Sequence, residues 1–280
     1  MAADDPLVTS RAVSGTLLKL PGFAHFEAPA SWTAIDFISD LHLWPQGPRT
    51  FEAWAAYMRA SKADAIFILG DLFEVWVGDD SLDLPFEASC LRVLNESSMS
   101  RFIGFMHGNR DFLVGEQMLA DSGVTLLDDP TVLECFGSSA LLSHGDELCL
   151  GDVDYQRFRL LVRSAAWQQQ FLKQPLTDRQ QQVRALRSES EQRKMGNPDP
   201  TEWVDLDLSE TRRWMTAAAT PALVHGHTHK PCDQDIGTGF VRHVLSDWDL
   251  DPADESHRRA EVLRLSASGF QRMTPLQASA

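Results

Sequence analysis

Short apolar runs, each followed by a polar cluster, recur along most of the chain. Residues 65–69 (Ala-Ile-Phe-Ile-Leu) are wholly apolar, which is typical of a strand buried in a covered sheet. A helix is expected at residues 51–59. The same pattern predicts further strands at residues 34–39, 101–106, 124–127, 131–136, 140–143 and 222–224. Strands that alternate with helices predict an α/β core whose sheet is covered by helices.

Residues 153–195 interrupt this alternation and are rich in Gln, Arg and Leu. Apolar side chains recur there near helical spacing, at Phe158, Leu161, Val162, Ala165, Phe171 and Leu172. We expect one helix to end at Pro175 and the next to be capped by Thr177 or Asp178. Residues 207–210 (Asp-Leu-Ser-Glu) are spaced as in a capping box, which predicts the start of another helix.

The predicted organisation is therefore a core interrupted by one insertion. Near the end of the chain, residues 240–245 and 261–265 are expected to be antiparallel strands that finish a second sheet. Residues 1–30 have no clear period and are expected to form an extension or a loosely packed edge. The expected parts are residues 1–32 as an N-terminal extension, 33–152 as the first part of the core, 153–215 as a helical cap insertion and 216–280 as the second part of the core.

Charge is distributed unevenly along the 280 residues, of which 43% are hydrophobic. The formal net charge of −15 weighs against the backbone of a nucleic acid as the main partner. Residues 155–194, however, contain nine Lys or Arg and three Asp or Glu, a local balance of +6. One interpretation is a solvated basic helix face. The other is a lid that meets an anionic substrate or an anionic membrane surface.

The sequence shows no secretory signal, no membrane-spanning run and no closely spaced cysteine pair. The N-terminus lacks the basic and apolar regions of a secretory signal, and no run of eighteen apolar residues occurs. The four cysteines are widely spaced and form no CxxC pair. We therefore expect a cytoplasmic protein with reduced cysteines.

Five polar clusters follow the apolar runs. They are Asp-Leu-His at residues 40–42, Gly-Asp at 70–71, Gly-Asn-Arg-Asp at 108–111, His-Gly-Asp at 144–146 and His-Gly-His-Thr-His at 225–229. In open α/β sheets ligands bind beyond the carboxyl ends of the strands, so these clusters are expected to converge. Their hard oxygens and imidazoles suit a pair of divalent metal ions. Taken singly, each has an ordinary alternative: Asp71 as a turn residue or helix cap, and His144 as a hydrogen-bonded core residue.

The ordered set DxH, GDxxE, GNRD, HGD and GHTH resembles the calcineurin-like metallophosphoesterases. The flanking residues, from about residue 35 to about residue 244, are most similar to one branch, the UDP-2,3-diacylglucosamine diphosphatases of lipid A synthesis. The resemblance implies a four-layer αββα sandwich with a helical cap and a dinuclear metal site. It implies one metal held by Asp40, His42, Asp71 and His229, and a second held by Asp71, Asn109, His144 and His227. Two Mn²⁺ ions per chain are expected, although the ligand set also suits Fe²⁺, Co²⁺ or Zn²⁺.

Arg110 departs from the wider family, in which a His often follows the motif Asn. An arginine cannot give up a proton, but it stabilises negative charge that develops on a phosphate. Arg110 therefore favours cleavage of a pyrophosphate, whose leaving group is already a stable anion. The alternative role of Arg110 is a structural ion pair with Asp111. We expect Arg110 and Asp71 to be catalytic. The resemblance implies substrate contacts from Asn109, Arg110, Asp152, Tyr155, Arg187, Ser190, Lys194 and His227. His107 and His225 are expected to support the site or the packing rather than bind metal.

The activity implied by the resemblance is hydrolysis of UDP-2,3-diacylglucosamine. A hydroxide held between the two metals would attack the α-phosphorus and release UMP and 2,3-diacylglucosamine 1-phosphate. The expected partners are the acylated UDP-sugar and the anionic surface of the inner membrane, to which the protein would bind peripherally, with no nucleic acid and no obligate protein partner. The alternatives are a general dinuclear phosphoesterase acting on other phosphodiesters, and a metal-bearing scaffold without turnover.

Overall fold

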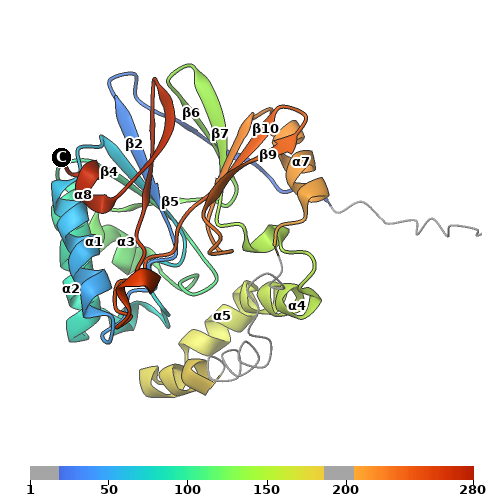
Figure 1. Ribbon diagram of the computed structural model, residues 1–280. Coiled ribbons are helices and arrows are strands. Elements are labelled where there is room, and N and C mark those ends of the chain that lie inside the picture. Colours follow the sequence, from blue (N-terminus) through green and yellow to red (C-terminus); the bar gives the residue numbers. More distant parts are fainter. Residues whose placement is uncertain (1–18, 186–204) are drawn as a thin grey trace, which may run out of the picture.

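The computed structural model describes residues 19–185 and 205–280, in which two β-sheets lie face to face (Figure 1). The first sheet has the order β12-β11-β2-β3-β4-β5. Its parallel strands are β2 (Ala34–Ile38), β3 (Ala65–Leu69), β4 (Phe102–Met106) and β5 (Thr125–Leu127). β11 (Val262–Ser266) and β12 (Gly269–Met273) extend it in antiparallel fashion next to β2.

The second sheet has the order β1-β6-β7-β8-β10-β9. Its strands are β1 (Ala24–Glu27), β6 (Thr131–Cys135), β7 (Ser138–Ser143), β8 (Ala222–His225), β9 (Cys232–Gly237) and β10 (Phe240–Val244). β7, β8 and β10 run parallel to one another, so their carboxyl ends meet at one edge. β9 pairs with β10, and β6 with β7, in antiparallel fashion.

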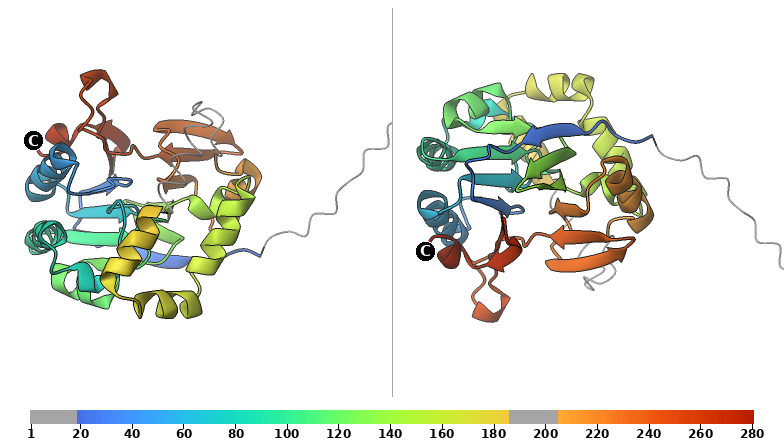
Figure 2. Two further views of the ribbon diagram at one scale, coloured as in Figure 1. Left: turned by 90° about the horizontal axis from the view of Figure 1, so that it is seen from below. Right: turned by 90° about the horizontal axis from the view of Figure 1, so that it is seen from above.

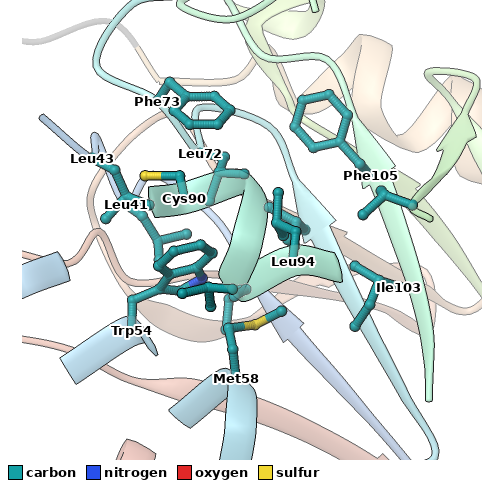
Figure 3. Close-up of a cluster of buried hydrophobic side chains, with 14 of the residues drawn as sticks. Leu41, Leu43, Trp54, Met58, Leu72, Phe73, Cys90, Leu94, Ile103 and Phe105 are labelled. Carbon is teal, nitrogen blue, oxygen red and sulfur yellow. The ribbon is translucent and has the colours of Figure 1, made fainter. Parts of the chain in front are cut away.

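The strands bury alternate side chains on opposite faces, which produces four layers. Phe67 faces the other sheet, where it joins Leu142 and Val224, whereas Ile66 and Ile68 face helices. The helices on that side are α1 (Pro48–Ala60), α2 (Pro85–Ser98), α3 (Glu116–Ser122) and α8 (Pro275–Ala278). Figure 3 shows their core, with Trp54, Met58 and Leu94 against Ile103 and Phe105.

α7 (Leu208–Ala217) covers the outer face of the second sheet, where Trp214 and Met215 pack on Leu141 and Leu223. The layers are thus helix, sheet, sheet, helix, and the predicted αββα sandwich is confirmed. Short 3₁₀ turns occur at Asp79–Ser81, Asp146–Leu148 and Glu255–His257.

The insertion forms α4 (Val153–Val162), α5 (Ala165–Leu172) and a further helical stretch at residues 176–185. Viewed from below, these helices lie in front of the ends of the sheets (Figure 2). The expected contacts Arg187, Ser190 and Lys194 lie outside the described residues. No helix among residues 19–185 and 205–280 has the length and apolar character needed to cross a membrane.

Several expected boundaries differ from the structure. Of the two alternatives for residues 1–30, residues 24–27 form a sheet edge rather than an extension, because β1 pairs with β6 at the outer end of the second sheet. This edge is not loosely packed, since Phe26 stacks on Trp32 beside the inter-sheet core. α7 packs on the core rather than in the cap. β10 and β11 lie in different sheets, whereas the sequence predicted that they would complete one sheet together. These differences all concern which distant segments pack together, and local patterns do not carry that information.

Helix starts were predicted with mixed success. Asp207 is the N-cap of α7 and accepts a hydrogen bond from the Glu210 backbone N–H at 2.8 Å. The Glu210 carboxylate does not close a capping box, because it accepts hydrogen bonds from Arg213 and Trp214 instead. The helix after Pro175 already begins at residue 176, so neither Thr177 nor Asp178 precedes it as a cap.

Candidate metal centre

The polar clusters lie where parallel strands of both sheets end. Asp40 and His42 follow β2, Asp71 follows β3, and Asn109 follows β4 of the first sheet. His144 follows β7, and His227 and His229 follow β8 of the second sheet. Because these ends meet at one edge of the sandwich, seven residues spread over 190 positions come together.

One group of side chains surrounds Asp40. The Nε2 atoms of His42 and His229 are 3.2 Å apart, and the His229 Nε2 atom is 3.3 Å from Oδ1 of Asp40. One ligand atom from each of these three residues lies within 4.8 Å of the others. Three converging donors at this separation are suited to one cation.

A second group surrounds Asn109. Its Oδ1 atom is 3.0 Å from Nε2 of His144 and 2.9 Å from Nδ1 of His227. Asp71 lies between the two groups. Its Oδ2 atom is 4.0 Å from His42 Nε2, and its Oδ1 atom is 3.7 Å from His144 Nε2. The two oxygens of one carboxylate therefore face the two groups.

Asp40 provides a test of whether the site suits a cation. Its side chain is fully buried, and Oδ2 accepts hydrogen bonds from Ser39 Oγ at 2.5 Å and from the His227 N–H at 2.9 Å. Oδ1 is buried and accepts no well-aligned hydrogen bond, and its neighbour is the His229 Nε2 atom at 3.3 Å. A buried carboxylate oxygen without a hydrogen bond is strongly unfavourable, and a divalent cation would satisfy it. The carboxylates, the Asn oxygen and the imidazoles fit such an ion.

The backbone at the site is strained. Asp40, His42, Asp71, His227 and His229 all have φ between 47° and 69°, the left-handed region. Five of the eight described non-glycine residues with positive φ are thus expected ligands. Asp and His tolerate this conformation better than most residues, but it still costs roughly 1–3 kcal/mol each. The sharp turns aim side chains into the site from the strand ends.

Asp111 joins the loops that carry Asp71 and Asn109. Its carboxylate is fully buried and accepts backbone hydrogen bonds from Leu72 at 2.7 Å and Gly108 at 2.8 Å. Burial and the negative charge of Asp71 raise the pKa of Asp111 to about 7. Asp111 is therefore engaged with the backbone, and the structure shows no side-chain pair between it and Arg110.

Outer groups orient the imidazoles. His144 donates Nδ1–H to the Leu69 carbonyl at 2.9 Å, which leaves Nε2 facing the site. His42 Nδ1 lies 3.2 Å from Oε2 of Glu74, and His229 Nδ1 lies 3.4 Å from Oδ2 of Asp247. In each case the nitrogen that faces away from the site has an oxygen beside it, as metal-binding histidines usually do.

The electrostatics reflect an excess of negative charge. Burial opposes the charged form of His144, but Asp71 and Asp40 outweigh it and raise its pKa to about 9. Burial likewise opposes the charged form of His229, but Asp247 and Asp40 raise its pKa to about 10. Burial and the positive charge of His144 lower the pKa of His227 to about 3. Without metal, protons on His144 and His229 therefore neutralise part of the negative charge of the site, which a bound cation would otherwise neutralise.

Comparison with known proteins agrees with this geometry. The model of the family described as calcineurin-like phosphoesterase matches residues 33–231. The chain belongs to this family. The predicted resemblance is confirmed, and the chain is accordingly a hydrolase by family.

Relatives of this phosphoesterase carry a more specific name. A protein named UDP-2,3-diacylglucosamine hydrolase from Pseudomonas entomophila strain L48 is 42% identical over 243 residues, which cover 84% of this chain and 95% of the relative. Another of that name from Chromobacterium violaceum is 41% identical over 217 residues, 77% of this chain and 90% of the relative. A third relative of that name, from Stenotrophomonas maltophilia strain R551-3, is 38% identical over 246 residues, which cover 84% of this chain and 95% of the relative.

Two further expected contacts of the phosphoesterase lie beside the expected metal ligands. The Arg110 side chain is 26% exposed, with Nη1 3.7 Å from Oε1 of Glu74. The Tyr155 ring centroid is 5.8 Å from that of His227, and its hydroxyl donates to Asp146 at 2.6 Å. Asp152 has a local role, because it is the N-cap of α4 and accepts from the Tyr155 N–H.

His107 and His225 do not join either group of ligands. His107 Nε2 is 2.9 Å from the Val114 carbonyl, and His225 is fully buried with Nδ1 2.8 Å from the Gly226 carbonyl. Burial lowers the pKa of each to about 4. Both contact backbone carbonyls outside the two groups, and support of the site or of the packing stays the prediction for each.

Sequence reasoning missed Asp111 and Asp247 as organisers of the site. Asp111 stood inside the GNRD cluster, but its buried backbone contacts depend on a loop about forty residues away. Asp247 follows β10 within three residues, in the same way as the ligands follow their strands. That polar position shortly after a predicted strand was the available signal.

Proposed function

We propose that this chain hydrolyses the pyrophosphate bond of UDP-2,3-diacylglucosamine, with UMP and 2,3-diacylglucosamine 1-phosphate as products. The observation that carries the proposal is the complete set of seven ligand positions in a chain whose relatives, about 40% identical over most of their length, bear the name UDP-2,3-diacylglucosamine hydrolase. A scaffold that had lost turnover would not need every ligand position.

The proposed cofactor is a pair of Mn²⁺ ions. One would be held by Asp40, His42, Asp71 and His229 and the other by Asp71, Asn109, His144 and His227. Support comes from the opposed directions of the two Asp71 oxygens and from the buried Oδ1 of Asp40, which accepts no hydrogen bond. When bound, the two ions would lower the pKa of a water molecule toward neutrality and polarise the phosphoryl oxygens.

The chain's own residues have distinct proposed tasks. Arg110 lies beside the Asn109 group and would stabilise negative charge on the diphosphate, because its guanidinium stays charged throughout. Its backbone N–H donates to Asp71 Oδ1 at 2.8 Å, so the bridging carboxylate is held from the same loop. Asn109, His227, Asp152 and Tyr155 are the proposed substrate contacts on the described part of the chain.

The cap is the proposed site for the acyl chains and for the anionic surface of the inner membrane, with the protein peripheral on the cytoplasmic side. Support comes from α4, where Leu160 and Leu161 are 72% and 56% exposed. Exposed leucines on one helix are suited to an apolar partner. Arg187, Ser190 and Lys194 remain proposed substrate contacts outside the described residues.

A UMP-release assay on the diacylated UDP-sugar tests the proposal, with Mn²⁺, with chelator, and with UDP-N-acetylglucosamine as the comparison substrate. We expect Mn²⁺-dependent release from the acylated substrate and little from the other. Equal rates on both would contradict the lipid-specific function and leave a general phosphoesterase. No release from any phosphate ester would instead favour the scaffold.

A further inference from the structure

α4 is joined to the phosphoesterase core by polar contacts around Asp146, which is fully buried two residues after His144. Oδ2 of Asp146 accepts hydrogen bonds from the Tyr155 hydroxyl at 2.6 Å and from Nε of Arg159 at 2.9 Å. Nη2 of Arg163 lies 3.9 Å from the same oxygen. The first helix of the cap is therefore tied to the loop that carries one of the proposed ligands.

Arg163 also contacts the loop of Asn109. Its Nη2 donates to the Gly108 carbonyl at 2.9 Å, and its Cζ atom lies 5.1 Å from the centre of the Phe112 ring. These two contacts flank Asn109 and Arg110 on both sides. A single cationic side chain of the cap thus holds the segment that carries a proposed metal ligand and the proposed diphosphate contact.

The Gly108 segment has little freedom to move independently. Its N–H donates to Asp111 at 2.8 Å while its carbonyl accepts from Arg163. Gly108 packs so closely on Asp71 that a Cβ atom there would collide with the Asp71 side chain and backbone. A shift of this loop would therefore be passed to the carboxylate that faces both ligand groups.

The cap has a second anchor at its other end. Arg179, in the helical stretch at 176–185, is 1% exposed, donates to the Val77 carbonyl and pairs with Asp80. Val77 and Asp80 belong to the long segment that follows Asp71. The described helices of the cap are consequently fastened to the loops after β3 and β4 at two separate points.

We propose that Arg163 is a positioning residue, which holds Asn109 and Arg110 in place from the cap and thereby couples the cap to the second metal position. This inference rests on the proposed function, because it takes Asn109, His144 and His227 as ligands. Groups that orient metal ligands commonly change metal affinity by about 10–100-fold when removed. Arg163 acts through a backbone carbonyl, so the lower end of that range is expected.

The test compares four variants of the full chain. Arg163→Met removes the donors and the charge but keeps an unbranched side chain, and Arg163→Lys restores the charge with a single ammonium group. Arg157→Met is the matched control, because Arg157 lies on the same helix with its side chain 76% exposed and pairs with Asp154 at 3.4 Å. Metal-free protein is titrated with Mn²⁺ by calorimetry, and Asn109→Ala identifies the step that belongs to the second position.

For Arg163→Met we expect the second Mn²⁺ step to weaken by about tenfold, the first step to be unchanged, and kcat to fall more than KM rises. Arg163→Lys should recover part of the loss, and Arg157→Met should match wild type. Unchanged Mn²⁺ steps and kcat in Arg163→Met would overturn the inference alone. The inference would also be overturned if Arg163→Met weakened both Mn²⁺ steps equally and lowered the unfolding temperature, and if Arg163→Lys recovered none of the loss. A wild-type chain that binds no Mn²⁺ would overturn the proposed function as well.

Discussion

Gly226 is a position where a small added group would disturb the candidate metal centre. It precedes His227 and packs against Ser39 and Asp40, so that a Cβ atom built on it would meet Oδ2 of Asp40 and Oγ of Ser39. That Asp40 oxygen is the one that accepts hydrogen bonds from Ser39 and from His227. Gly226→Ala should therefore displace Asp40, although it adds only one methyl group.

The size of the effect follows from the contacts. The added Cβ would also come within 2.8 Å of the Ser39 Cβ, whereas carbon atoms pack best at about 3.5–4.0 Å. The buried neighbours must then move by about an ångström, and overpacking of this kind costs about 1–3 kcal/mol. Loss of one hydrogen bond to the charged carboxylate adds about 1.5–3 kcal/mol. We expect a total destabilisation of about 3 kcal/mol, near the lower end of the combined range because the loop can partly relax.

The assay is urea unfolding of metal-free Gly226→Ala, followed by calorimetric titration with Mn²⁺. Gly22→Ala is the matched control, because a Cβ atom at Gly22 meets nothing within 4 Å, and it should behave as wild type. We also expect Gly226→Ala to lose the Mn²⁺ step that involves Asp40. A variant as stable as wild type, with both Mn²⁺ steps intact, would refute the argument that Asp40 is held in place by crowding.

Four further results are expected. The pKa values of His144 and His229 are raised to about 9 and about 10, so Mn²⁺ must displace protons from these residues below pH 9. The affinity for Mn²⁺ should therefore rise with pH. Calorimetry in buffers of different ionisation enthalpy should detect the released protons, and their absence would contradict the prediction. The same raised values stabilise the metal-free protein fully below about pH 6.5, and this contribution is lost as the pH rises through 9 to 10. Asp71→Asn should abolish UMP release while circular dichroism shows an intact fold, and wild-type rates would disprove its proposed bridging role. Arg264→Met should destabilise the chain by about 3–5 kcal/mol, because it leaves the fully buried Asp36 without its ion pair. Mn²⁺ binding should not change. A smaller loss of stability in chemical unfolding would show that the hydrogen bonds from Tyr57 and Ser61 satisfy Asp36 alone.

The expected ligands could be recognised in the sequence because each cluster directly follows an apolar strand. The apolar run of residues 65–69 predicted β3 with its bounds, and Asp71 two residues later lies at the strand end as expected. Strand ends that share a direction meet at one edge, so convergence follows from topology without any knowledge of side-chain contacts. The αββα layers were implied by family resemblance and agree with the alternation of buried side chains.

The sequence by itself predicted most strands of the core, the cap as a helical insertion and the seven polar residues that the structure brings together. Periodicity and strand-end chemistry are local, so a short window of residues contains them. Only the tertiary structure decided that β1 joins β6, that β10 and β11 separate into two sheets, and that Asp111, Asp247 and Arg163 contact the loops of the site. Those choices depend on burial and on hydrogen bonds between segments far apart in the chain, and their free energies are set by the whole fold rather than by any one segment.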